Sequence, residues 1–159
     1  EFSRGEHNIN KVKLKLKDLV DEFRSLNNPY FESTQVQVSL DVPDVVIIGA
    51  KAKLFRVFQN LIGNAIEAFG DKPGAVKVTG TVSHAENMVQ IYIEDNAGGI
   101  PESIRDRLFE PFVSYGKREG TGLGTAIARS IVEAHNGSIS YRTETGRGTI
   151  FTINLPISR

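Results

Sequence analysis

The chain has no cysteine, and this absence excludes disulfide bonds, thiolate metal sites and a cysteine nucleophile. It also has no excess of charge, because 19 basic residues balance 19 acidic ones. Proteins that bind nucleic acid or anionic membranes through their overall field carry a basic excess, so charge recognition here depends on local patches. No apolar run approaches the ~20 residues that a bilayer-spanning helix needs. We expect a cytoplasmic chain without nucleic-acid or direct membrane contact, whether or not its parent protein is anchored in a membrane.

The length of 159 residues suits one domain. A domain of this size hides roughly 70% of the surface of its unfolded chain, which is enough for its own core. Residues 1–10 are polar and without pattern, so they are interpreted as a linker or the end of a preceding element. The domain is expected to cover residues 11–159.

Hydrophobic periodicity changes twice near the start of the chain. Residues 11–16 alternate lysine with apolar side chains, which predicts a strand with one solvated face. From Leu16 the apolar residues follow helical spacing, and the prediction ends this helix at residues 27–29, "NNP". A heptad pattern is an alternative, since three-four spacing also relates Ile9, Val12, Leu16, Leu19, Phe23 and Leu26.

The rest of the chain mixes strands and helices. Alternation or short apolar runs predict strands at residues 34–42, 45–49, 75–83, 88–95, 138–144 and 148–155, the third and fourth as a hairpin. Helical spacing predicts helices at residues 51–69, 101–108 and 122–135, and Asn136-Gly137 ends the last of them. The predicted class is α+β, a two-layer α/β sandwich with one mixed, mostly antiparallel sheet and helices on one face.

The stretch "EGTGLGTAIAR" places Gly120, Gly122 and Gly124 directly before a predicted helix. A helix N-terminus offers free N–H groups and partial positive charge, and glycines let a phosphate approach the backbone. Lys117 and Arg118 lie just upstream and could reach the same anion. A structural turn explains the glycines equally well, because the pattern is neither a P-loop nor a dinucleotide fingerprint.

A second candidate site residue is Asp95, at the end of the strand in "IYIEDNAGGIP". The period of two places Asp95 on the apolar face with Ile91 and Ile93. A buried carboxylate needs fixed donors, which are either protein groups or a ligand amine. Gly98 and Gly99 would leave room for a flat ring. The alternative is an aspartate that caps its own turn.

A third candidate lies on the helix "LFRVFQNLIGNAIEAF", where Asn60, Asn64 and Glu67 share one polar stripe. These oxygen-bearing side chains could hold a hydrated magnesium ion and the phosphates that it bridges. The alternative is an ordinary solvated helix face. Gly63 costs ~1 kcal/mol relative to alanine in a helix, which favours a close approach by another group.

Five segments in order now resemble one family. "NLIGNAIEA", "DNAGGI", "LFEPF", "GTGLGTAIA" and "GRGTIF" are similar to the asparagine box, first glycine box, phenylalanine box, second glycine box and terminal glycine motif of sensor histidine kinases. The resemblance covers about residues 11–159. It implies the Bergerat (GHKL) ATP-binding fold, a mixed sheet under about three helices, with a nucleotide between the helices and a mobile lid.

The resemblance also implies roles for individual residues. Asn64 corresponds to the magnesium-binding asparagine, with Asn60 one turn earlier. Asp95 corresponds to the aspartate that accepts a hydrogen bond from the adenine amino group, with Gly99 beside the ring. ATP and magnesium are the implied cofactors, and Asn60, Asn64 and Lys117 the implied catalytic residues.

The implied lid carries the remaining contacts. Nucleotide contacts are expected at Lys117, Arg118, Gly120, Thr121, Gly122, Leu123 and Gly124. Phe109 and Phe112 match the phenylalanine box, which shapes the lid. Residues 113–121 contain little apolar side chain to anchor them, so we expect this segment to be mobile.

Three departures from the family pattern matter. Ala97 occupies a position where relatives often have glycine, which is tolerable only if no positive φ is needed there. Glu67 occupies a position where many relatives have a lysine near the phosphates. The phosphoacceptor motif is missing, since none of the three histidines, His7, His84 and His135, has its sequence context.

The resemblance therefore implies a Mg-ATP-binding catalytic domain of a two-component sensor histidine kinase. It would transfer the γ-phosphoryl group to a histidine on a separate dimerisation domain of the same parent protein, which would in turn serve a response regulator receiver domain. An ATP hydrolase on the same fold is an alternative. It would need a glutamate base where Asn60 stands, and an amide cannot abstract a proton, although Glu67 keeps this alternative open. A non-catalytic nucleotide-binding interaction module is a third.

Overall fold

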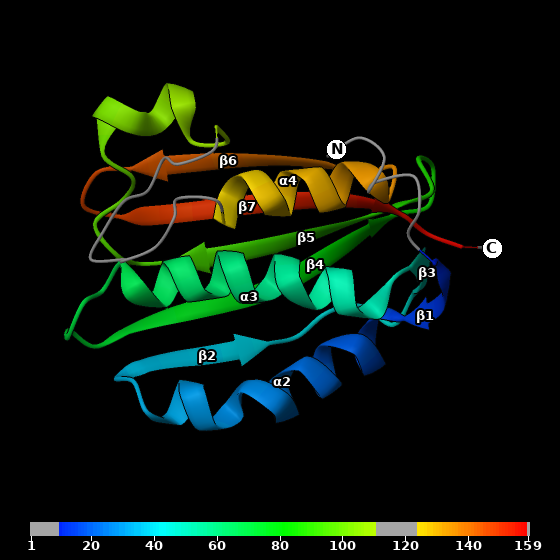
Figure 1. The fold of residues 1–159 in the computed structure, drawn as a ribbon, viewed down its shortest axis with the longest axis horizontal. Coiled ribbons are helices and arrows are strands. Elements are labelled where there is room, and N and C mark those ends of the chain that lie inside the picture. The colour runs from blue at the N-terminus through cyan, green and yellow to red at the C-terminus, as the bar shows by residue number, and fades with distance from the viewer. Residues whose placement is uncertain (1–9, 111–123, 159) are drawn as a thin grey trace.

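The computed structural model describes residues 10–110 and 124–158. A five-stranded sheet forms one layer, in the order β2 (Val36–Leu40), β4 (Gly74–Ser83), β5 (Met88–Asp95), β7 (Gly148–Pro156) and β6 (Ser138–Glu144). The second layer contains α2 (Leu16–Glu32), α3 (Lys51–Glu67) and α4 (Gly124–Ala134), which lie together on one side of the sheet (Figure 1). The predicted α+β sandwich with three helices on one face is confirmed.

The five-stranded sheet is mixed and mostly antiparallel, as predicted. Only β2 and β4 pair in parallel, and every other neighbouring pair in the sheet is antiparallel. The hairpin from β4 to β5 turns at Asn87, which has a positive φ of 58°. Along β5 the buried side chains are Val89, Ile91, Ile93 and Asp95, so the period of two holds over the whole strand.

The core lies between the two layers, where the apolar stripe of each helix meets the inner face of the sheet. Phe23 of α2 contacts Phe58 of α3, with ring centroids 5.6 Å apart. Each fully buried side chain of this size contributes about 1.5–3 kcal/mol, so the helical stripes seen in the sequence are what hold the layers together.

A second, two-stranded sheet is formed by β1 (Val12–Lys15) and β3 (Val46–Gly49), which pair antiparallel. The strand predicted at residues 11–16 is therefore present, and the heptad alternative does not hold for Val12–Lys15. The pairing of β1 with β3 was not predicted, because its partners, from Lys15 with Val46 to Val12 with Gly49, are far apart in the sequence and leave no local pattern.

The predicted end of the first helix is wrong. α2 continues through Pro29 to Glu32 instead of stopping at residues 27–29. Proline inside a helix costs ~3 kcal/mol. Phe31 offsets this cost because it is buried and packs 6.2 Å from Phe23, centroid to centroid.

Two shorter predictions need smaller adjustments. The helix predicted at residues 101–108 is the 3-10 helix η1, and it covers Glu102–Arg107. The helix predicted from residue 122 is described from Gly124 onward. Asn136 takes the left-handed conformation with φ 61°, which confirms the predicted stop of α4. A Cβ at Gly137 would lie 2.1 Å from the carbonyl oxygen of Asn154, so glycine is required there. None of the described helices has the length and apolar character needed to cross a membrane.

Candidate functional site

Asp95 lies at the last position of β5 on the core side, and only 8% of its surface is exposed. Its partner across the sheet is Thr149 of β7. The Asp95 Oδ1 atom accepts a hydrogen bond from the backbone N–H of Ala97 at 3.0 Å, and the N–H of Thr149 donates to the same carboxyl group. The predicted burial is confirmed, and so is the turn-capping contact that was its alternative.

Burial raises the pKa of the Asp95 carboxyl group from 3.8 to about 6. The two backbone donors, Ala97 and Thr149, act in the opposite direction, while the nearby charge of Glu94 adds to the increase. An ionised carboxylate has about four acceptor positions, and two N–H groups do not fill them. The group can therefore accept a further hydrogen bond from a ligand amine.

The turn after Asp95 explains one departure from the family pattern. Among the described residues, the only non-glycines with positive φ are Asn87 and Asn136, so Ala97 needs no glycine conformation. Gly99 does have a positive φ of 91°, and a Cβ there would lie 3.0 Å from the Glu144 carbonyl oxygen. Gly98, by contrast, has no neighbouring atom within 4 Å of the Cβ position. The open side of this turn is therefore at Gly98.

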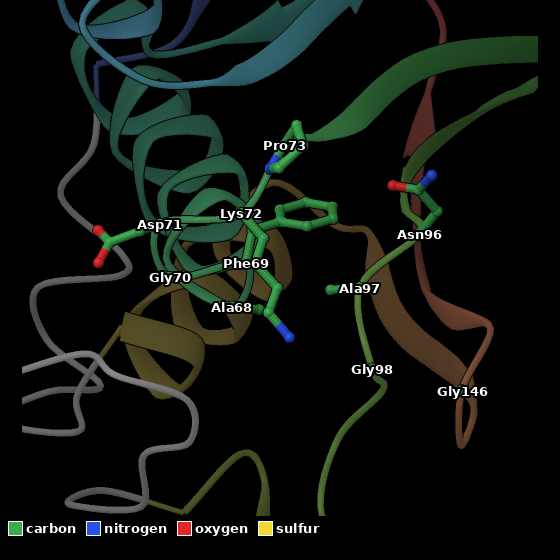
Figure 2. A pocket seen from close by; sticks show the side chains of 10 residues that line it. All are labelled: Ala68, Phe69, Gly70, Asp71, Lys72, Pro73, Asn96, Ala97, Gly98 and Gly146. Atoms are coloured by element: carbon green, nitrogen blue, oxygen red, sulfur yellow. The ribbon is translucent and has the colours of Figure 1, made fainter.

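A cavity of about 790 Å³ lies beside this turn. One wall consists of residues 68–73, which connect α3 to β4, and the other of residues 96–98 and Gly146 (Figure 2). Phe69 faces the space from the first wall. The Lys72 side chain points into the cavity between Ala68 and Ala97, whereas Asp71 points away from it (Figure 2). The cavity therefore offers an apolar ring, an open backbone segment and one cation. Asp95 does not line it but directly precedes the wall residue Asn96.

The polar stripe of α3 approaches the same cavity. Asn64 is buried, and its carbonyl accepts from the N–H of Ala68, the first residue of the cavity wall. Asn60 lies one turn earlier and is partly buried. The stripe is therefore not simply a solvated face. The close approach inferred at Gly63 is not seen, since no described atom lies within 4 Å of its Cβ position.

Glu67 is the last residue of α3, and its carboxylate lies near Tyr30, close to the end of α2. Burial raises the pKa of the Tyr30 hydroxyl, and the charge of Glu67 adds to the increase. This electrostatic effect requires the Glu67 carboxylate to be near Tyr30.

Magnesium can be tested against the donor set. In residues 10–110 and 124–158, no three His, Cys, Asp or Glu side chains are grouped to hold a metal ion. The Asn64 amide supplies an oxygen ligand of the type Mg²⁺ prefers, and this ion keeps several waters and bridges phosphates when bound to nucleotides. The residues fit a metal that arrives with its nucleotide.

Much of the predicted phosphate site lies outside the described residues. This applies to Lys117, Arg118, Gly120, Thr121, Gly122 and Leu123. Phe112 of the phenylalanine box and the segment expected to be mobile also lie outside the described residues. Gly124 is described as the first residue of α4. Phe109 packs against Tyr141 and Phe151, at centroid distances of 5.9 and 6.4 Å.

His135 is satisfied inside the protein. It is 3% exposed, and its Nε2 accepts from the backbone N–H of Ala50 at 3.0 Å. Nδ1 must therefore carry the proton, which it donates to the Ile131 carbonyl at 2.8 Å. Both ring nitrogens are occupied, which gives His135 a structural role. His84 lies exposed in the β4–β5 turn, and His7 is outside the described residues.

Thr149, like Lys72, is a residue of the candidate site that sequence reasoning missed. It is buried opposite Asp95, and its Oγ1 lies 3.0 Å from that of Thr143. The segment "GRGTIF" was recognised as a motif, but only the pairing of β5 with β7 shows which of its residues faces the carboxylate.

Comparisons with known proteins show which family the chain resembles. The family described as "Histidine kinase-, DNA gyrase B-, and HSP90-like ATPase" matches residues 49–159. Sporulation kinase A of Bacillus subtilis is 32% identical over 157 residues, which cover 98% of this chain and 25% of that protein. The chain spans about a quarter of the length of the curated relatives it matches.

Two solved structures are similar over nearly the whole chain. The nucleotide-free catalytic domain of histidine kinase ThkA has a TM-score of 0.79 and 26% identity, covering 93% of this chain and 96% of that one. Full-length ShkA in complex with AMPPNP has a TM-score of 0.82 and 25% identity, covering 99% and 34%. The chain therefore belongs to the histidine kinase-, DNA gyrase B- and HSP90-like ATPase family. Within it, the chain is a catalytic ATP-binding domain of the sensor histidine kinase type.

Proposed function

We propose that this domain binds Mg·ATP and transfers the γ-phosphoryl group to a histidine on a dimerisation domain of its parent protein. One observation carries the proposal. The buried carboxylate of Asp95 ends β5 beside a cavity, and the buried amide of Asn64 lies one helical turn before the opposite wall. The AMPPNP complex of ShkA, which shares the fold, supports a triphosphate as ligand.

Asp95 would accept a hydrogen bond from the adenine amino group, and the apolar and glycine-rich cavity walls would contact the ring. Asn64 would hold magnesium, with Asn60 one turn earlier. The phosphates would lie toward the start of α4, at Lys117, Arg118, Gly120, Thr121, Gly122, Leu123 and Gly124. The adenine-side glycine was assigned as Gly99, whereas the cavity is lined by Gly98.

In the reaction, a neutral imidazole nitrogen of the acceptor attacks the γ-phosphorus. The new N–P bond forms as the bond between the γ-phosphorus and the bridging oxygen breaks, and ADP leaves with that electron pair. Magnesium, held by Asn64, would supply charge neutralisation at the phosphates. The domain itself contributes by positioning the nucleotide and by excluding water, as is general for phosphoryl transfer.

An ATP hydrolase on this fold is the alternative, and the amide at position 60 argues against it. Asn60 occupies the helix position from which a base would act in ATPases of this fold, and an amide cannot abstract a proton from water, whereas Glu67 keeps the alternative open. Steady release of phosphate by the isolated chain, lost in Glu67→Gln, would favour hydrolysis.

The broader assignment is also a proposal. Residues 1–10 would be a linker or the end of a helical dimerisation segment, and residues 11–159 the catalytic domain. A response regulator receiver domain would take the phosphoryl group from the acceptor histidine. The chain would act in the cytoplasm.

Titration of the purified chain with ATP and ADP, with and without Mg²⁺, tests nucleotide binding. We expect saturable binding that magnesium strengthens. Phosphoryl transfer is tested by adding the upstream helical segment of the parent protein and labelled ATP. Acid-labile phosphohistidine is the expected product, and binding without this product would leave only a nucleotide-binding interaction module.

A further inference from the structure

Thr125, the second residue of α4, is 3% exposed and donates its hydroxyl proton to the carbonyl oxygen of Leu108 at 2.6 Å. Leu108 directly follows η1 and is 1% exposed. Both ends of this hydrogen bond are buried, so breaking it would leave a carbonyl group without water to replace the donor. The bond joins residues on either side of the segment 111–123.

A second contact joins the same two elements one turn further along α4. The Arg129 guanidinium carbon lies 5.5 Å from the centroid of the Phe109 ring, within range of a cation–π interaction. Phe109 in turn packs against Tyr141 of β6 and Phe151 of β7. The first turns of α4 are thus fixed to residues 108–109 and, through them, to the sheet.

The other end of this connection reaches the turn that follows Asp95. Arg105 of η1 donates from Nε to the Ile100 carbonyl at 2.9 Å, and the Ile100 N–H donates to Thr143 Oγ1 at 2.8 Å. Thr143 then contacts Thr149, the neighbour of Asp95 across the sheet. Direct contacts therefore run from the start of α4 to the buried carboxylate.

We propose that Thr125 is a positioning residue for the phosphate end of the nucleotide. This inference rests on the proposed ATP-binding function. The N–H groups at the start of a helix bind phosphate only when they point at it, so their placement relative to Asp95 decides whether base and phosphates can be held together. The hydrogen bond to Leu108 sets that placement before the nucleotide arrives.

The test compares Thr125→Val, which keeps the shape but removes the donor, with Thr125→Ser, which keeps the hydroxyl. Affinities for ATP and adenosine are measured by calorimetry on the whole chain. We expect Thr125→Val to weaken ATP binding about tenfold and to leave adenosine binding unchanged, because adenosine does not use α4. Thr125→Ser should retain ATP affinity.

Two results would overturn this role: unchanged ATP affinity in Thr125→Val, or an equal loss for ATP and adenosine, which would indicate general destabilisation. Arg129→Met removes the cation–π contact with Phe109 at an exposed position, and it replaces Thr125→Val in the test if the valine variant does not fold. It should show a smaller loss for ATP and none for adenosine, and an unchanged ATP affinity in this variant would also count against the proposal. Failure of the unmodified chain to bind ATP would instead refute the proposed function itself.

Discussion

Asp95 and Thr149 face each other across β5 and β7, and the Thr149 N–H donates to the carboxylate. The threonine side chain is turned to Thr143 instead, at 3.0 Å. The sheet thus supports the carboxylate through its backbone while leaving acceptor positions for a ligand. Burial without full compensation is visible in the pKa of Asp95, which rises to about 6.

Replacing Asp95 by asparagine should stabilise the ligand-free domain while weakening nucleotide binding. The raised pKa of Asp95 means that its ionised form is unfavourable in the folded state. Raising the pKa from 3.8 to about 6 lowers the free energy of unfolding by roughly 3 kcal/mol at pH 8 relative to pH 3. The neutral amide of asparagine avoids part of this cost. We expect Asp95→Asn to increase the free energy of unfolding in urea by ~1 kcal/mol or more. Unchanged ATP affinity in this variant would refute the adenine assignment.

The affinity for the base should fall in acid. Below a pKa of about 6 the Asp95 carboxyl group becomes protonated and loses its charge-assisted hydrogen bond with the amino group. Adenosine is the suitable ligand, since it has no phosphates that titrate. We expect about tenfold weaker binding at pH 5 than at pH 8. Asp95→Asn is the control, and its weak binding should not vary over this range.

His135 should make the fold less stable in acid, whereas the Asp95 carboxyl group makes the fold more stable there. Burial lowers the pKa of this imidazole, and the charge of Lys11 adds to the decrease, while the bond to the Ile131 carbonyl opposes it. A depressed folded-state pKa gives stability that is present above the unfolded value of 6.5 and lost as pH falls through the folded value.

The measurement is the free energy of unfolding against pH, with His135→Phe as the variant. Phenylalanine leaves the Ala50 N–H without its acceptor, so we expect a loss of about 1–3 kcal/mol at pH 8. That loss should shrink on acidification, because the variant has no imidazole to protonate. A constant difference between the two proteins at every pH would contradict the assigned role. Performing both measurements in the Asp95→Asn background separates the two titrations.

Local pattern was sufficient for most elements and for Asp95. Alternation along β5 depends only on the sequence of that strand, and it placed the carboxylate on the buried face. The local pattern did not predict where α2 ends. The local rule for proline was overruled by the burial of Phe31 against Phe23, a contact within a packed core. Thr149 was missed for a related reason, because its position opposite Asp95 depends on long-range strand pairing.

Lys72 should contribute to binding the base and not the phosphates. Its side chain points into the cavity between Ala68 and Ala97, on the wall opposite the turn that follows Asp95 (Figure 2). A lysine ammonium beside an aromatic base gains about 0.5–1 kcal/mol at an exposed site. We expect Lys72→Met to weaken adenosine and ATP by the same factor, about threefold. Lys77→Met is the matched control, since Lys77 is an exposed residue of β4 that does not line the cavity. A loss confined to ATP would place the Lys72 ammonium at the phosphates, and no loss for either ligand would remove it from the site.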